Sequence, residues 1–326
     1  MKVAASVLDL IGNTPLLRLS RVTKGLVGVH LLAKCEFMNP TGSLKDRMAR
    51  EMVEDAEQKG KIVPGSTILI EPTSGNTGIS LAAVGSVKGY GVVIVMTEDV
   101  NREIQELVEH FGAELVLTPV EGLTSADMQF EGQEIYREKA ARMMRNRITN
   151  QMIAADPAKH MLDQGSNFAN VRAHWQTGRE ILEQTDGQVD ALVAGVGTGG
   201  TLMGISQVLR EANPSVRIVA VEPAEAASSS ADEPTIYGIQ GVSDGLVPHI
   251  FDSSLVDEIV RVRSLDAWRM AAGLAREEGL AVGVSSGANV TAALEVASRL
   301  GADRTVVTLL PDRASRYFSL GLFERR

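Results

Sequence analysis

The stretch "DALVAGVGTGGTLMGISQVLREANP", residues 190–214, holds one complete unit of the predicted fold. It begins with an apolar run typical of a buried strand, and the "LMGISQVLREANP" at its end has the spacing of a helix. A glycine-rich turn joins the two. In such units the helix carries the chain back across the sheet, so that successive strands lie parallel. The stretch therefore predicts an α/β fold.

The same alternation of short apolar runs and helical patterns continues along most of the chain. Two segments with helical spacing, residues 79–89 and 101–112, end in glycine. They follow the strands expected at residues 66–71 and 91–96. Strands are expected at residues 66–71, 91–96, 113–118, 190–197, 216–223, 258–262 and 304–311. A helical stretch over residues 125–147 and a polar stretch over residues 150–161 interrupt the alternation. We therefore expect mostly parallel sheets with helices on both faces, and a passage between two lobes near this interruption.

Composition limits the classes of function. The chain has 326 residues, enough for one large or two ordinary domains, and its 44% hydrophobic and 22% charged residues are typical of globular proteins. The net charge is -9 and no long basic run occurs, which argues against nucleic-acid binding. No apolar run is long enough to span a bilayer, and the N-terminus lacks the apolar core of a signal peptide. We expect a cytoplasmic protein that binds neither nucleic acid nor membrane.

Cysteine and histidine usage gives two further expectations. Cys35 is the one cysteine of the chain, so no internal disulfide can form, which fits a reducing cytosol. Its place in the strand-like "LLAKCEF" favours a small buried hydrophobe over a catalytic nucleophile. The five histidines are scattered without the spacing of metal ligands, so no metal site is expected.

The turn "AGVGTGGT", residues 194–201, is the first candidate for a binding site. Backbone N–H groups at a helix N-terminus, left uncovered by glycine, form a nest for a phosphate, and Thr198 and Thr201 can add hydroxyl donors. The alternative is a tight strand–helix turn with no ligand. The spacing matches neither the dinucleotide fingerprint nor the Walker A loop, which disfavours dinucleotide hydride chemistry.

A second candidate is "EPTSGNTGIS", residues 71–80, where another strand runs into a helix. Thr73, Ser74, Asn76 and Thr77 supply small donors and acceptors beside two glycines. Such a loop can hold a carboxylate through hydroxyl and backbone N–H groups. An ordinary helix N-cap is the alternative, although a cap needs one such residue and not four.

The third candidate is Lys45 in "FMNPTGSLKDRMAR", residues 37–50, where a turn becomes a helix. Its spacing alone favours an ordinary surface lysine. Beside a phosphate held by another loop, it suggests a Schiff base to a phosphorylated aldehyde, because burial and nearby helix dipoles lower the pKa of an amine. Pyridoxal 5'-phosphate is the natural candidate for such a ligand.

Together these motifs resemble the cysteine synthase (O-acetylserine sulfhydrylase) family of fold-type II pyridoxal-phosphate enzymes. The resemblance runs in the family's order over nearly the whole chain. It rests on "IGNTPLLRL", "NPTGSLKDR", "EPTSGNTG", "GVGTGGT", "IQGVSDGLVP", "GVSSGA" and "LLPDRASRYFS". The Asp-Arg pair in the last motif is nearer to the B-type cysteine synthases than to the A-type.

The resemblance implies a fold of two lobes, like that of the tryptophan synthase β subunit, each a mostly parallel sheet flanked by helices. Residues 45–152 would form a smaller mobile lobe that carries the lysine and the asparagine loop. Residues 1–44 and 153–326 would form a larger lobe that carries the phosphate-binding loop. The resemblance also implies a homodimer.

The resemblance assigns roles to particular residues. Lys45 would form the internal aldimine and then abstract the substrate α-proton, and Asn76 would bind the 3'-oxygen of the cofactor. The phosphate would be held by Gly197, Thr198, Gly199, Gly200 and Thr201. The substrate would be bound by Thr73, Ser74, Thr77 and Gln164 at its carboxylate and by the loop of Gly241 at its amino end.

The implied reaction is β-replacement, in which O-acetyl-L-serine and sulfide give L-cysteine and acetate through an α-aminoacrylate. One alternative keeps the cofactor and changes the donor or nucleophile: O-phosphoserine, thiosulfate, homocysteine, or an amine that gives 2,3-diaminopropionate. Another is a non-catalytic regulatory relative, which the presence of Lys45 disfavours. A serine acetyltransferase partner is a further expectation of the family.

Four departures from the family pattern bear on these roles. Arg313 falls where the resemblance places a serine that contacts the pyridine nitrogen. Phe168 replaces the proline of an Asn-Pro-x-Asn motif, and Asp244 replaces a small residue in the substrate loop. Residues 141–161 exceed the usual connection and could form a lid or a partner surface.

Overall fold

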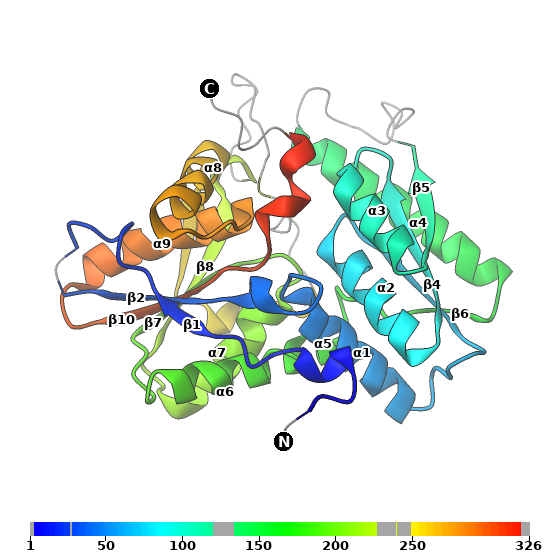
Figure 1. Cartoon of the computed structure of the whole chain (residues 1–326), viewed down its shortest axis with the longest axis horizontal. Helices are drawn as coiled ribbons and strands as arrows, with labels where there is room; N and C mark the ends of the chain where they lie inside the picture. The colour runs from blue at the N-terminus through cyan, green and yellow to red at the C-terminus, as the bar shows by residue number, and fades with distance from the viewer. Residues whose placement is uncertain (1–2, 27, 120–133, 227–238, 240–248, 321–326) are drawn as a thin grey trace.

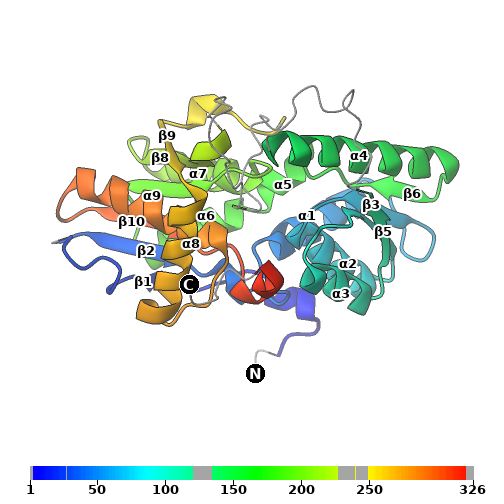
Figure 2. The same cartoon turned by 90° about the horizontal axis from the view of Figure 1, so that it is seen from above.

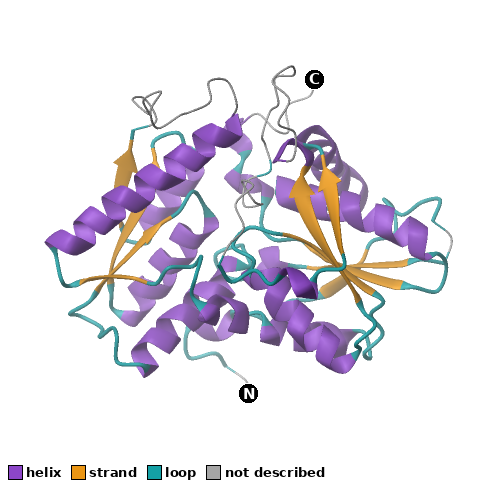
Figure 3. Cartoon of the chain, turned by 180° about the vertical axis from the view of Figure 1, so that it is seen from behind, coloured by secondary structure: helices purple, strands orange, loops and turns teal. Residues whose placement is uncertain are grey.

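The computed structural model describes residues 3–26, 28–119, 134–226, 239 and 249–320. Figure 3 shows two separate groups of strands, each covered by helices. One sheet has six strands and the other has four, and all neighbouring strands are parallel except β1 and β2. The α/β fold with mostly parallel sheets, expected from the sequence, is confirmed.

The six-stranded sheet forms the core of the larger lobe, in the order β1-β2-β10-β7-β8-β9. Its strands are β1 (Leu16–Arg18), β2 (His30–Lys34), β7 (Ala191–Gly195), β8 (Arg217–Pro223), β9 (Glu258–Val262) and β10 (Thr305–Leu309). Along β7, Ala191 and Val193 pack on one face of the sheet and Leu192 on the other. Both faces are apolar, because helices cover both.

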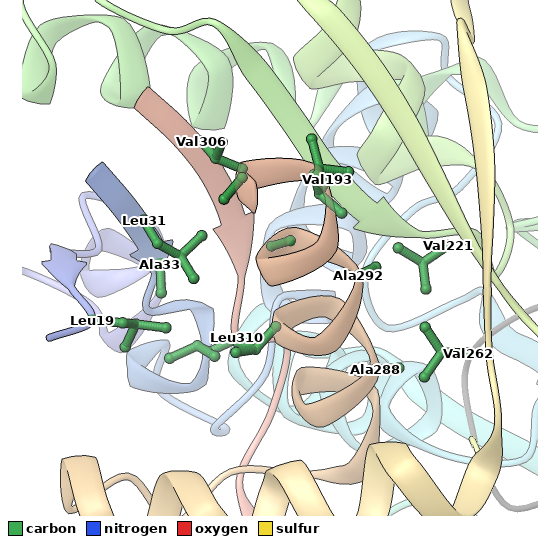
Figure 4. Close-up of a cluster of buried hydrophobic side chains, with 14 of the residues drawn as sticks. Leu19, Leu31, Ala33, Val193, Val221, Val262, Ala288, Ala292, Val306 and Leu310 are labelled. Atoms are coloured by element: carbon green, nitrogen blue, oxygen red, sulfur yellow. The ribbon is translucent and has the colours of Figure 1, made fainter. Parts of the chain in front are cut away.

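Small residues allow one helix layer to lie close to this sheet. Helix α9 (Val284–Leu300) presents Ala288 and Ala292 to Val193 and Val221 (Figure 4). It also crosses α8 (Ser264–Gly273) closely, since a Cβ on Gly287 would lie 1.9 Å from the carbonyl oxygen of Ala267. The opposite face is covered by α6 (Trp175–Gln184) and α7 (Gly200–Ala212).

The four-stranded sheet has the order β5-β4-β3-β6. Its strands are β3 (Ile68–Pro72), β4 (Gly91–Thr97), β5 (Glu114–Thr118) and β6 (Lys159–Met161). One face packs against α1 (Lys45–Gln58), α2 (Asn76–Lys88) and α3 (Arg102–His110). The other packs against α4 (Glu134–Ala155).

Residues 141–161 therefore belong to the layers of this lobe. Ile148 and Met152 of α4 pack on Ile70 and Val93, and β6 pairs with β3. The side chains that pack inward belong to the core of this lobe, and the lid or partner surface expected for this stretch stays a prediction for its exposed side chains, such as Met143. The lobe boundary expected at residue 152 falls inside α4, and β6 follows it.

Short elements complete the described chain. Helices α1 and α5 (Phe168–Arg172) lie between the two sheets in both views (Figures 1 and 2). The short elements are η1 (Val7–Leu10), η2 (Glu36–Met38), α5 (Phe168–Arg172), η3 (Ala224–Ala226), η4 (Ser253–Leu255), η5 (Leu274–Glu278), η6 (Ala314–Arg316) and η7 (Phe318–Leu320). Across the described ranges, no helix combines the length and apolar character needed to cross a membrane.

Candidate active site

A cavity lies where the carboxyl ends of β7 and β10 meet the starts of several helices. Gly195 and Leu309, the last residues of these neighbouring strands, both line it. The full lining is Leu44, Lys45, Asn76, Ala194, Gly195, Gly197, Thr198, Gly199, Thr201, Ser285, Asn289, Leu309, Pro311 and Asp312. Ligands of open α/β sheets gather at the carboxyl ends of strands, so the cavity is the candidate active site.

The N-terminal ends of four helices converge on this cavity. Lys45 is the first residue of α1, Asn76 is the first of α2, Gly199 caps α7, and Ser285 lies in the first turn of α9. The first N–H groups of a helix have no partner within the helix and carry partial positive charge. The cavity is therefore suited to an anion.

The glycine loop between β7 and α7 is anchored where it leaves β7. Asn289 accepts a hydrogen bond from the N–H of Gly195 (2.8 Å) and donates to the carbonyl of Leu309 (2.9 Å), which joins the ends of the two strands. Gly199 has a φ of +89°, a conformation that other residues rarely adopt. The loop thereby presents backbone N–H groups and the side chains of Thr198 and Thr201 to the cavity.

Lys45 carries the candidate reactive amine. Its side chain is half-buried and lines the cavity, and no hydrogen bond or ion pair to its Nζ occurs within the described ranges. Burial lowers the pKa of Lys45 to about 8, although the negative charge of Asp312 opposes this shift. Roughly a tenth of such an amine is neutral, and hence nucleophilic, at pH 7.

Asp312 and Asn76 form a polar pair across the cavity. The Asn76 Nδ2 donates to Oδ2 of Asp312 (2.7 Å), and the Tyr317 hydroxyl donates to the same oxygen. Oδ1 of Asn76 and Oδ1 of Asp312 are buried without a partner among the described residues. Burial raises the pKa of Asp312 despite the positive charge of Arg316. Two buried polar atoms without partners mark a place where a polar ligand fits.

The residues predicted to bind a carboxylate lie together at the start of α2, beside the cavity lining. Thr77 donates its hydroxyl to Oε1 of Gln164 (2.7 Å), while Ser74 is exposed. Oγ1 of Thr73 accepts from the N–H of Gly75 (3.2 Å). The Oε1 of Gln164 thus has a donor in Thr77, and the N–H groups of its Nε2 are left to donate to a ligand.

Glu71 holds the backbone beneath Gln164. Its two carboxylate oxygens accept from the N–H groups of Asp163 and Gln164, each at 3.0 Å. Burial raises the pKa of Glu71 to about 7 even though these hydrogen bonds favour the charged form. Glu71 thereby ties β3 to the segment that follows β6.

A buried ion network fixes the start of α1 against the larger lobe. Arg47, two residues after Lys45, donates to both oxygens of Glu36 (2.7 and 2.8 Å) and of Glu180 (2.8 Å each). Lys34 completes the network through Glu180 at 2.7 Å. Two positive and two negative groups balance inside the protein, so the network holds its geometry without excess buried charge.

The structure brings together many of the predicted residues. Lys45, Asn76, Gly197, Thr198, Gly199 and Thr201 line one cavity. Gly200 begins α7 next to them, and Thr73, Ser74, Thr77 and Gln164 form the adjacent group. Gly241 and Asp244 lie outside the described residues.

Two departures lie away from the cavity. Arg313 is exposed, donates Nε to the carbonyl of Phe37 (3.0 Å) and is not part of the cavity lining, so what contacts the pyridine nitrogen stays a proposal. Phe168 is also exposed and packs edge-on against Trp175, with 6.1 Å between ring centroids. Cys35 is buried, and burial raises its pKa to about 11, which fits the non-catalytic reading.

Sequence reasoning missed Ser285, Asn289 and Asp312. The first two belong to a helix whose first turn reaches the cavity, and the "GVSSGA" motif contains Ser285. Asp312 follows β10 directly. A polar residue just after a predicted parallel strand was the available signal, because such positions face the ligand edge of the sheet.

Comparisons with known proteins agree with this geometry. The sequence model of the family described as "Pyridoxal-phosphate dependent enzyme" matches residues 7–312. Cysteine synthase 3 of Caenorhabditis elegans is 42% identical over 318 residues, which cover 97% of this chain and 88% of that protein. Cystathionine beta-synthase of Rattus norvegicus is 39% identical over 331 residues, covering 99% of this chain; the chain spans only 56% of that relative.

A solved structure agrees as well. The crystal structure of cysteine synthase from Entamoeba histolytica matches with a TM-score of 0.88 and 35% identity, covering 100% of this chain and 92% of that one. The resemblance deduced from the motifs is thus confirmed, including its cofactor, pyridoxal 5'-phosphate. The chain belongs to the cysteine synthase family of fold-type II pyridoxal-phosphate-dependent enzymes.

Proposed function

We propose that the protein catalyses β-replacement on O-acetyl-L-serine, with sulfide as the nucleophile and L-cysteine and acetate as the products. The observation that carries the proposal is the amine of Lys45, whose pKa is lowered to about 8, in a cavity lined by an anion-binding glycine loop. The start of α2, where the N–H groups of Asn76 and Thr77 have no partner within the helix, lies beside it. The cysteine synthase relatives supply the donor and the nucleophile.

The residues present fit pyridoxal phosphate. Its phosphate would be held by Gly197, Thr198, Gly199, Gly200 and Thr201, and its carbonyl carbon would meet Lys45. Asn76 would bind the 3'-oxygen, since its amide lines the cavity and Nδ2 has a second hydrogen besides the one that it donates to Asp312. The Ser285 hydroxyl, which lines the same cavity, is our candidate for the pyridine nitrogen. When bound, the cofactor supplies an electron sink that acidifies the α-proton of an amino acid.

The carboxylate of the amino acid would bind at the start of α2. The N–H groups of the first turn of α2 and the side chains of Thr73, Ser74 and Gln164 would be the donors. The Thr77 hydroxyl orients Gln164 in this structure, so Thr77 contributes through that contact and its own N–H. Gly241, beyond the described residues, stays our proposal for the loop at the amino end.

Once its amine is released from the cofactor, Lys45 would accept the α-proton of the substrate. A lowered pKa keeps part of the amine neutral near pH 7, and Asp312 stabilises the ammonium ion that forms. We further propose that carboxylate binding draws the smaller lobe over the cavity and excludes water.

The test is a donor and nucleophile panel on the purified holoenzyme, with L-cysteine and acetate measured directly. The proposal expects O-acetyl-L-serine with sulfide to give the highest kcat/KM. O-phosphoserine, thiosulfate and amine nucleophiles should react more slowly. Formation of cysteine at the rate of the protein-free control would overturn the proposal.

A second candidate keeps the same site and takes homocysteine as the nucleophile. The observation that favours it is the 39% identity to a cystathionine beta-synthase. A higher kcat/KM for cystathionine formation than for cysteine formation in the same panel would assign this activity in place of the first.

We also propose, from the family resemblance, that the protein is a cytoplasmic homodimer and that a serine acetyltransferase can dock on it. Sedimentation equilibrium tests the dimer, and a single species with the mass of one chain would contradict it. Co-sedimentation with a purified serine acetyltransferase tests the partner, and its absence at micromolar concentrations would contradict the docking.

A further inference from the structure

Asn170, on α5, is a buried amide that contacts both candidate ligand-binding segments. It is 1% exposed. Its Nδ2 donates to the backbone carbonyl of Gln164 (2.8 Å) and to the hydroxyl oxygen of Thr198 (2.9 Å). A carbonyl oxygen can only accept, so the nitrogen of the amide must face Gln164 and the orientation of the amide is fixed.

These two contacts set which donors remain for ligands. The Thr198 oxygen accepts from Asn170, so its hydroxyl hydrogen is left to donate into the cavity that Thr198 lines. Gln164 is held at its backbone N–H by Glu71, at its carbonyl by Asn170 and at its Oε1 by Thr77. Its Nε2 is thereby left for the substrate.

The other end of the amide fits closely against the start of α7. A Cβ built on Gly200 would lie 2.1 Å from Oδ1 of Asn170 and 2.4 Å from its Cγ. Oδ1 has no partner among the described residues, so packing against Gly200 rather than a hydrogen bond occupies this side. Interiors this dense transmit small displacements. A shift of α7 therefore moves the amide, and with it the segment of Gln164.

We propose that Asn170 is a positioning residue that couples the phosphate-binding loop to the substrate carboxylate site. The inference rests on the proposed function, because it takes Thr198 as a phosphate ligand and Gln164 as a carboxylate ligand. Occupation of the glycine loop fixes Thr198, and through Asn170 it fixes Gln164 for the substrate. Asn170 itself contacts neither ligand.

The test compares three variants with the wild type: Asn170→Ala, Gly200→Ala and the double variant. Asn213→Ala is the control, since it removes an amide at the opposite end of α7. That amide donates to the carbonyl of Val189 (3.4 Å) and accepts from the N–H and the hydroxyl of Ser215 (3.1 and 2.7 Å), and none of these residues lines the cavity. The dissociation constant of pyridoxal phosphate is measured on each apoprotein by equilibrium dialysis, and kcat and KM for O-acetyl-L-serine on each holoenzyme. Thermal unfolding of each apoprotein reports the stability of the fold.

Asn170→Ala is expected to weaken pyridoxal phosphate binding about fivefold and to raise KM by a similar factor, with a smaller change in kcat. Gly200→Ala should weaken cofactor binding to a similar extent because its methyl group displaces the amide. The double variant should bind pyridoxal phosphate no more weakly than Asn170→Ala, since the amide that the Gly200→Ala methyl group would displace is then absent. Asn213→Ala should match the wild type in both constants.

Two results would overturn the inference while leaving the proposed function intact. One is an active wild type together with an Asn170→Ala variant whose cofactor dissociation constant and KM are unchanged, whatever its thermal midpoint. The other is a double variant whose losses add. A wild type that binds no pyridoxal phosphate would instead overturn the proposed function.

Discussion

Replacing Arg47 by methionine should destabilise the protein more than any exposed ion pair can. Arg47 is 2% exposed and makes four hydrogen bonds to the carboxylates of Glu36 and Glu180. Methionine fills similar space without the charge. The variant would leave two buried carboxylates facing Lys34 alone. Removing one partner of a buried ion pair typically costs about 3–5 kcal/mol, because the remaining charge loses its compensation.

The pH dependence of this loss can be worked out from Glu36. Burial alone would raise the pKa of Glu36, but the charge and hydrogen bonds of Arg47 outweigh burial and hold the pKa at about 2. A carboxyl with a lowered pKa in the folded state stabilises the fold above its unfolded pKa, and this stabilisation disappears as the pH falls toward the folded value. Between pH 7 and 5 the wild type keeps this stabilisation in full. Without Arg47, burial should raise the pKa of Glu36 above its unfolded value, so the variant should regain stability as the pH falls from 7 and the carboxylate takes up a proton. The difference in the free energy of unfolding between wild type and variant should therefore be largest at neutral pH and smaller in acid.

The assay is urea denaturation of the apoprotein, followed by circular dichroism at several pH values between 7 and 5. Arg102→Met is the control, since Arg102 pairs with Glu106 at 2.6 Å on the surface, where its side chain is 81% exposed. The free energy of unfolding of the control variant should stay close to that of the wild type at every pH. A loss below about 1 kcal/mol for Arg47→Met at pH 7, or a difference that widens in acid, would refute the reasoning.

Three further predictions address the site. Lys45→Ala should abolish turnover and leave the far-UV circular dichroism spectrum unchanged, and residual turnover near the wild-type rate would contradict the mechanism. The rate at which the apoprotein takes up pyridoxal phosphate should rise with pH through about 8, because the pKa of Lys45 is lowered to about 8 and the neutral amine reacts; a flat profile from pH 6 to 9 would argue against it. Glu71→Gln should raise KM for O-acetyl-L-serine about fivefold, because the new amide nitrogen would face the N–H of Asp163 or Gln164 and could not accept its hydrogen bond. An unchanged KM would show that Glu71 does not support substrate binding.

Local patterns predicted much of the fold and of the site. The apolar runs at β3, β4, β7 and β8 are continuous because both faces of each parallel sheet are covered, and this makes them visible in the sequence. The glycine loop and Lys45 were found because a turn that meets a helix is a local feature. β6 escaped notice, since it has three partly exposed residues in a polar stretch.

Long-range contacts explain the rest. Arg47 and Glu180 are separated by 133 residues, so no local pattern reveals that they pair. Asp312 reaches the cavity because β10 lies between β2 and β7, an order that sequence proximity does not reveal. Arg313, its neighbour, points to the surface.

The most direct test of the account is to find where the cofactor attaches. The protein is incubated with pyridoxal phosphate, reduced with sodium borohydride, digested with trypsin and analysed by mass spectrometry. Because trypsin does not cleave after a modified lysine, attachment at Lys45 should replace the peptide of residues 35–45 by a pyridoxyl-bearing peptide of residues 35–47. The account predicts that this is the principal modified peptide. Modification at other lysines with residues 35–45 recovered unmodified would contradict it.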